Sequence, residues 1–144
     1  MKQPYGIGIL GNCCTHGVGV CQSFQHDQRF NVITGHEANP RRQAELSLAI
    51  GRELVTSYQM VIERKDVDIV VITCDPCDKA QMVEAAAAAG KHIFLNKPLC
   101  ESLDSARQIE RTVERYSIQF VYDIPMVRSV PVYARMQQEL WDGK

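Results

Sequence analysis

The chain has 144 residues, enough for one hydrophobic core of ordinary domain size but not for two. Its 16 lysines and arginines nearly balance 17 aspartates and glutamates, and no basic run interleaved with aromatic residues is present, which excludes an evident nucleic-acid surface. No apolar stretch approaches the roughly 20 residues of a membrane span, and the N-terminal segment is too short for a secretory leader. We therefore expect a cytoplasmic protein that binds a small molecule and forms a homo-oligomer, with no membrane or nucleic-acid partner.

The first half of the chain alternates strands with helices. In chain order, its hydrophobic periodicity predicts a strand at 5–10, a helix at 17–28, a strand at 30–36, a helix at 40–50, a short strand at 54–56 and a helix at 57–64. Asn39 is expected to cap the second helix, with Pro40 at its first position and Gly51 beyond its end. Ser57 is expected to cap the third helix.

The second half continues the alternation. It predicts a strand at 67–73, a helix from 76 to a stop at Gly90, a strand at 92–96, a helix at 102–116 and a strand at 118–122. The run VDIVVIT at 67–73 is almost unbroken in β-branched residues, which is typical of a strand buried on both faces at the centre of a parallel sheet. Asp75 is expected to be the N-cap of the next helix, with Pro76 at its first position.

Six strands joined by right-handed helical crossovers predict an α/β fold with a doubly wound parallel sheet, the Rossmann fold, and helices on both faces. We assign residues 1–124 to this dinucleotide-binding domain. Residues 125–144 are predicted to form a loop and one helix, which either docks back on the domain or begins a C-terminal substrate domain absent from this chain.

The loop after the first strand has the setting of a pyrophosphate site. It leaves a strand, opens a helix and precedes a second strand, although only the first glycine of G-x-G-x-x-G is in register. Backbone amides and a helix N-terminus, rather than glycine side chains, bind phosphate. The predicted cofactor-binding residues of this loop are Gly11, Asn12, Cys13, Cys14, Thr15, His16 and Gly17.

An acidic residue stands at the tip of the second strand. In this fold such a carboxylate accepts hydrogen bonds from the ribose hydroxyls of the adenosine and repels a 2′-phosphate. Glu37 therefore predicts NAD as the cofactor and makes NADP less favoured, while Arg41 and Arg42 lie close enough to soften that preference.

The chain resembles the Gfo/Idh/MocA oxidoreductases, whose N-terminal domain is a Rossmann fold. The resemblance covers nearly all 144 residues and is carried by IGILG with its loop, HEANPRR, DVDIVVITCDP, AAAAAGKHIFLNKPL and VRSVP. The most specific segment, AGKHIFLNKPL, is similar to the family's A-G-K-H-V-x-x-E-K-P-L. The resemblance implies hydride transfer between NAD and a carbinol carbon of a sugar, polyol or similar small molecule.

The resemblance also implies roles for single positions. Lys97, beside Pro98 in the place of the E-K-P lysine, would be catalytic by orienting the substrate and sharing in proton transfer. Arg128 would correspond to an arginine that follows the last strand. The further predicted cofactor contacts are Arg41, Thr73, Cys74, Asp75, Pro76, Asn96, Lys97 and Pro98.

Three positions depart from the family pattern. Asn96 replaces the glutamate of E-K-P, while Asp75 and Lys79 replace the proline and the histidine of T-P-x-x-x-H. The family's catalytic aspartate and histidine belong to a C-terminal α/β domain, which we expect to lie outside these residues. The chain alone is therefore expected to be catalytically incomplete.

Six cysteines offer an alternative interpretation. Without a secretory signal they are expected to be reduced thiols. The fold would bring Cys13, Cys14, Cys74, Cys77 and Cys100 to one edge of the sheet, where thiols can bind zinc or exchange disulfides. There is only one CxxC, and buried cysteine is common as an apolar filler, so no metal ligand is assigned. A non-catalytic module that senses nucleotide, or pairs with another chain through the final helix, is a third interpretation.

Overall fold

The structure is a computed structural model that describes residues 3–123 and 131–143, so the predicted Arg128 lies outside the described residues. The strands are β1 (Tyr5–Leu10), β2 (Phe30–His36), β3 (Ile69–Ile72), β4 (His92–Asn96) and β5 (Phe120–Asp123). The helices are α1 (Thr15–His26), α2 (Pro40–Ile50), α3 (Tyr58–Ile62), α4 (Lys79–Ala88), α5 (Leu103–Arg115) and α7 (Pro131–Trp141).

The strands form one parallel sheet in the order β2-β1-β3-β4-β5, which confirms the predicted fold class and the central place of β3. The sheet contains five strands rather than six. Leu54 makes only an isolated bridge to Gly35, and the adjoining Val55 amide donates to the Gly35 carbonyl at 2.9 Å. Ser57, the N-cap of α3, follows directly. The chain therefore leaves the edge of the sheet before more residues can pair with β2.

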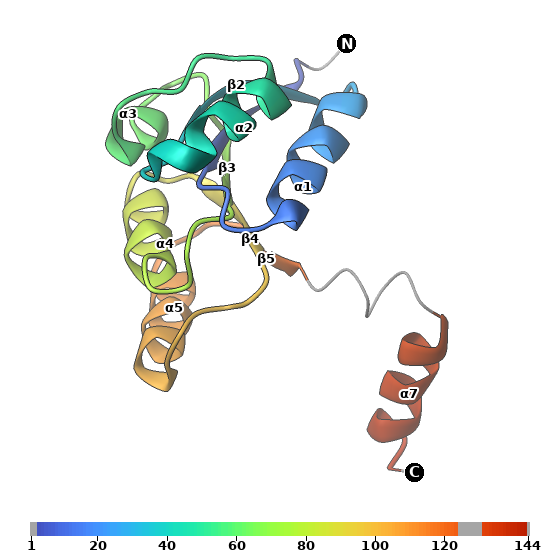
Figure 1. The fold of residues 1–144 in the computed structure, drawn as a ribbon. Helices are drawn as coiled ribbons and strands as arrows, with labels where there is room; N and C mark the ends of the chain where they lie inside the picture. The colour runs from blue at the N-terminus through green and yellow to red at the C-terminus, as the bar shows by residue number, and fades with distance from the viewer. Residues whose placement is uncertain (1–2, 124–130, 144) are drawn as a thin grey trace.

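Helices cover both faces of the sheet (Figure 1). On one face α1 and α2 pack on a core of Ile7, Ile9, Cys21, Val32, Leu46, Ile50 and Val71. On the other face α3, α4 and α5 enclose a larger core. Its buried residues are Leu10, Val61, Ile62, Val67, Val70, Ile72, Cys74, Ala80, Val83, Ala86, Ala87, Ile93, Leu95 and Ile109. The small side chains of the alanine run let α4 lie close to the sheet.

Helices α2, α3 and α5 begin at side-chain caps, whereas α1 and α4 begin without one. The Asn39 side chain accepts a hydrogen bond from the Arg41 amide at the start of α2, and Ser57 does the same for the Met60 amide in α3. The prediction that Asp75 caps a helix starting at Pro76 is wrong, because α4 starts at Lys79. Residues 75–78 form a turn instead, and the Asp75 carboxylate is engaged elsewhere, as described below.

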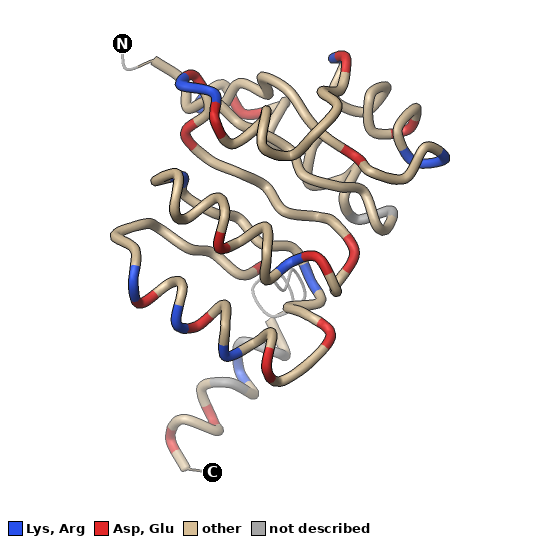
Figure 2. The backbone as a smooth tube through the Cα atoms, turned by 90° about the vertical axis from the view of Figure 1, so that its left-hand side faces the viewer, with Lys and Arg blue, Asp and Glu red and all other residues tan. Residues whose placement is uncertain are grey.

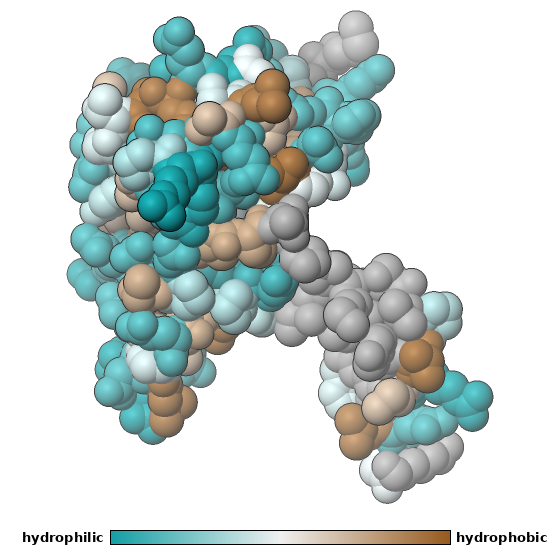
Figure 3. All heavy atoms as spheres, in the orientation of Figure 1, coloured by the Kyte–Doolittle hydropathy of each residue, from teal (hydrophilic) through white to brown (hydrophobic). Residues whose placement is uncertain are grey.

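Helix α7 stands apart from the sheet (Figure 1). Val132, Met136 and Leu140 are more than half exposed on it, and hydrophobic side chains are visible on its surface in Figure 3. Figure 2 shows acidic and basic residues interspersed along the backbone. None of the helices in the described ranges has the length and apolarity needed to span a bilayer.

Candidate functional site

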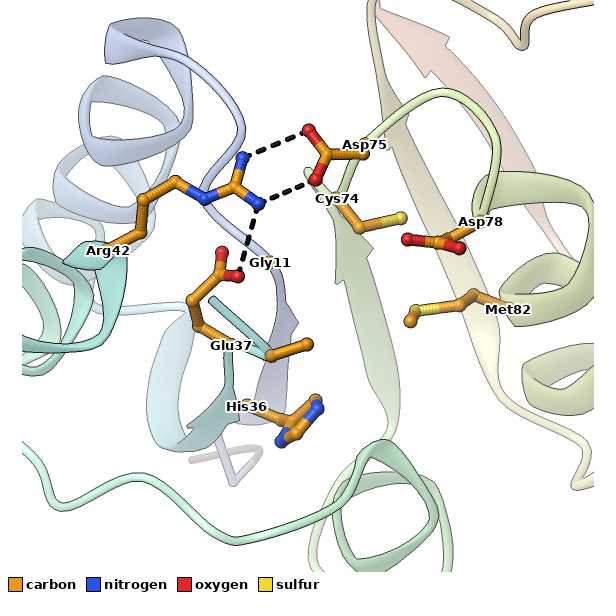
Figure 4. A pocket seen from close by; sticks show the side chains of 9 residues that line it. Gly11, His36, Glu37, Arg42, Cys74, Asp75, Asp78 and Met82 are labelled. Atoms are coloured by element: carbon orange, nitrogen blue, oxygen red, sulfur yellow. Dashed lines mark hydrogen bonds and ion pairs between the residues drawn. The ribbon is translucent and has the colours of Figure 1, made fainter. Parts of the chain in front are cut away.

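The strand order reverses between β1 and β3, so the loops that follow these strands run in opposite directions and leave a crevice between them. A pocket lies at this point, at the carboxyl edge of the sheet (Figure 4). It is lined by Gly11, His36, Glu37, Ala38, Arg42, Cys74, Asp75, Asp78 and Met82. These residues come from the ends of three neighbouring strands and from the helices that follow two of them, which is the usual place for a ligand in this type of sheet.

Gly11 makes the tight turn out of β1. Its φ is +85°, and a Cβ added there would lie 2.3 Å from the Cα of Cys74, so no other residue fits. Hydrogen bonds to other parts of the chain hold the loop in place. The amides of Gly11 and Cys13 donate to the carbonyls of His36 and Thr73, at 2.7 and 2.9 Å, and the Thr73 hydroxyl donates to the Gly11 carbonyl.

The start of α1 is the part of the loop that can meet an anion. Thr15 and His16 occupy its first two positions, whose amides have no intrahelical acceptor, and the Gly17 amide donates back to Cys14. A Cβ on Gly17 would lie 2.9 Å from the Asn12 Oδ1 atom, so glycine allows the helix to approach the loop closely. The first turn of α1 is therefore the part of this loop whose first two backbone amides have no intrahelical acceptor and can donate to an anion as a ligand.

Glu37 is buried at the tip of β2, with 3% of its surface exposed. One carboxylate oxygen accepts a hydrogen bond from the Asn12 amide at 2.6 Å, and the other accepts one from the Asn39 amide at 2.7 Å. The carboxylate therefore joins the β1 loop to the start of α2. Each oxygen keeps a second lone pair, so the group can still accept bonds from a ligand.

Arg42 spans the crevice (Figure 4). Its guanidinium donates to both carboxylate oxygens of Asp75, at 2.9 and 2.5 Å, and lies 3.4 Å from Glu37. This hydrogen-bonded pairing lowers the pKa of Asp75. Arg41, the arginine that was assigned to the cofactor, is exposed and does not line the pocket. Helical side chains lean toward the N-terminus, which carries the Arg42 side chain back toward the end of β2.

The segment after β4 holds the predicted catalytic lysine. Lys97 is half-buried, and its ammonium lies 3.8 Å from the Cys14 sulfur, so the ends of β1 and β4 approach each other. Lys79 is fully buried, and its ammonium donates to the carbonyls of Asn96 and Pro98 on either side of Lys97. Burial lowers the pKa of Lys79. Lys79 thus fixes the segment that carries Lys97.

Besides Nε of Arg42, two polar atoms at this edge are buried without a hydrogen-bond partner among the described residues. They are Oδ1 of Asn12, after β1, and Nδ2 of Asn96, at the end of β4. One can accept and the other can donate, and buried unsatisfied groups of this kind are uncommon in proteins. A dinucleotide carries both donors and acceptors along its length, so it is a ligand that could pair with both of these atoms.

The cysteines do not gather into a metal site. None of the six forms a disulfide, and within residues 3–123 and 131–143 no group of three or more His, Cys, Asp and Glu side chains is placed to hold a metal ion. Cys74 is buried against Gly11, and burial raises the pKa of its thiol to about 12. A protonated, enclosed thiol serves as a packing group rather than as a ligand.

Two further predicted residues lie in the loops that follow β3 and β4. Pro76 is half-buried in the turn after β3, and Pro98 is exposed after Lys97. The sequence interpretation missed the engagement of Asp75 by Arg42 and the burial of Lys79. The usable signal was the pair of departures from T-P-x-x-x-H, because two new charged side chains in one crevice require partners.

Comparisons with known proteins agree with this geometry. A family model described as "Oxidoreductase family, NAD-binding Rossmann fold" (GFO_IDH_MocA) matches residues 6–123. Among curated relatives, a dTDP-3,4-didehydro-2,6-dideoxy-alpha-D-glucose 3-reductase of Saccharopolyspora spinosa is 26% identical over 110 residues. That match covers 76% of this chain and 33% of the relative.

Solved structures share the fold. KijD10, a 3-ketoreductase from Actinomadura kijaniata in complex with TDP-benzene and NADP, superposes with a TM-score of 0.76 at 21% identity, over 97% of this chain and 44% of that one. GenD2 from gentamicin A biosynthesis, in complex with NAD, gives a TM-score of 0.81 at 19% identity, over 96% and 39%. The chain therefore spans less than half the length of these proteins, and both NAD and NADP occur among them.

Proposed function

The chain belongs to the Gfo/Idh/MocA family of oxidoreductases, and from that membership we propose that it is an NAD-binding unit for hydride transfer to or from a sugar, polyol or similar small molecule. The observation that carries the proposal is the crevice at the strand reversal, with Glu37, the start of α1 and Lys97 around it. Relatives that reduce keto sugars support the substrate class.

Each part of the crevice has a role in the proposal. Glu37 accepts hydrogen bonds from the adenosine ribose, and the first amides of α1 face the pyrophosphate. Asn96 donates its unused amide hydrogens near the nicotinamide ribose. The bound cofactor supplies the hydride chemistry. Lys97 orients the substrate oxygen and shares in proton transfer.

The substrate half of the enzyme is proposed to be a second domain that follows this one, because the relatives are more than twice as long as the matched region. In this proposal the complete reaction requires both domains. None of the six cysteines forms a disulfide, which fits the reducing cytoplasm that we propose as the location.

Thiol labelling tests the position of the cofactor. Cys13 and Cys14 are half-buried beside the proposed pyrophosphate site, whereas Cys77 is exposed on the turn before α4. NAD at ten times its dissociation constant is expected to slow alkylation of Cys13 and Cys14 by about tenfold, by simple occupancy. Mass spectrometry of the alkylated peptides measures this, with Cys77 as the internal control. Equal labelling rates with and without NAD at all three thiols would contradict the assignment.

A further inference from the structure

The guanidinium of Arg42 is shared by two carboxylates. Asp75 takes both of its terminal nitrogens, and Glu37 lies 3.4 Å from one of them. Its third nitrogen, Nε, is buried without a partner. The planar fork of arginine is well suited to bind a phosphate through two hydrogen bonds. In this protein the fork is already occupied by Asp75.

The ion pair of Arg42 and Asp75 lies in the pocket where we propose that a dinucleotide binds. Arg42 and Asp75 both line the pocket that contains Glu37, and they meet across it, from the start of α2 to the turn after β3 (Figure 4). Because Arg42 lies 3.4 Å from Glu37, a ribose hydroxyl that bonded to Glu37 would lie next to the guanidinium. A 2′-hydroxyl can donate to Glu37, whereas a 2′-phosphate meets two carboxylates and one guanidinium that is in use.

We propose that Asp75 is a specificity-determining residue, which withholds Arg42 from a 2′-phosphate and so makes the protein select NAD over NADP. The inference rests on the proposed function, because it concerns how the same crevice distinguishes two cofactors. Glu37 contributes repulsion that does not depend on Arg42. Asp75 adds a second effect, since it removes the cation that would otherwise compensate that repulsion.

The pair can be tested without unfolding the protein. The side chains of Arg42 and Asp75 are 23% and 43% exposed, and ion pairs with this much solvent contact contribute little to stability. Asp75→Asn keeps the size of the side chain and removes its charge. Asp78→Asn is the matched control, because it removes one negative charge from the same pocket while Arg42 stays bound to Asp75.

The experiment measures dissociation constants of NAD and NADP by calorimetry on the 144-residue chain and on these variants. Asp75→Asn is expected to shift the preference toward NADP by about tenfold or more, the strength of one charge-assisted contact, and Asp78→Asn by less than about threefold. Adding Arg42→Gln to Asp75→Asn should abolish the gain. Arg42→Gln alone should not raise NADP affinity, because it leaves the carboxylates of Glu37 and Asp75 without their cation.

The possible results distinguish a failure of the role proposed for Asp75 from a failure of the proposed function. If Asp75→Asn and Asp78→Asn shift the preference equally while NAD binding is retained, the role of Asp75 is overturned and the proposed function stands. If Arg42→Gln does not reverse the gain, Arg42 is not the group that Asp75 controls. If the unsubstituted chain binds neither dinucleotide, the proposed function fails, and this inference fails with it.

Discussion

Replacement of Glu37 by alanine is expected to weaken NAD binding by at least about 100-fold, because two hydrogen bonds from ribose hydroxyls to a charged acceptor are lost. It should also lower the free energy of unfolding by about 3 kcal/mol, since amides left without an acceptor cost about 1–3 kcal/mol each. The affected amides are those of Asn12 and Asn39, which both bond to this buried carboxylate.

Calorimetry and chemical denaturation measure the two effects of this substitution separately. Glu37→Gln retains one acceptor oxygen and the shape of the side chain, so it should fall between alanine and the unsubstituted protein in both measurements. Glu45→Gln is the control, because Glu45 is an exposed carboxylate that bonds to the Asn12 side chain rather than to its amide. An alanine variant that bound NAD as tightly as the original protein would contradict the ribose assignment.

Replacement of Lys79 by methionine is expected to lower the free energy of unfolding by about 2–4 kcal/mol, because two buried carbonyls lose a charged donor. These carbonyls, of Asn96 and Pro98, flank Lys97, so the position of that lysine should change as well. Lys91→Met is the matched control. Lys91 also donates to two carbonyls, but from a half-buried position at the other edge of the sheet, so its loss should destabilise less.

The Lys79 substitution also has a pH signature. Burial lowers the pKa of Lys79 below its ordinary value of 10.5, so the folded protein releases this proton at a lower pH than the unfolded chain does. The contribution of Lys79 to stability therefore rises with pH, up to about pH 10.5. The difference in unfolding free energy between the original chain and Lys79→Met should be larger near pH 10 than near pH 7. A difference that stayed constant or shrank would show that Lys79 is not buried as described.

Local signals in the sequence were sufficient for much of the fold. The β-branched run before Thr73 identified the central strand, because only a strand covered on both faces needs apolar residues at nearly every position. Asn39 and Ser57 marked the starts of two helices through their side-chain caps. Residues 54–56 were expected to pair along their length, but Ser57, which follows directly, caps α3 and takes the chain away from the sheet after one bridge.

The site was harder to predict because its contacts join distant parts of the chain. Asp75 followed by Pro76 has the local pattern of a helix start, yet Arg42, 33 residues earlier, takes its carboxylate. A lysine at position 79 predicts an exposed side chain, and only the carbonyls after β4 make its burial possible. The position of Glu37 after the second strand suggested a ribose contact, which stays a prediction, but nothing in the sequence indicated its bond to the Asn12 amide.

The most direct test of the account is titration of the 144-residue chain with NAD in a calorimeter. The crevice between β1 and β3, with Glu37 at one end and Lys97 at the other, predicts saturable binding of one NAD per chain, weakened by Glu37→Ala and with NAD preferred to NADP. Absence of any saturable heat at millimolar NAD, with the chain shown to be folded by circular dichroism, would contradict the central claim.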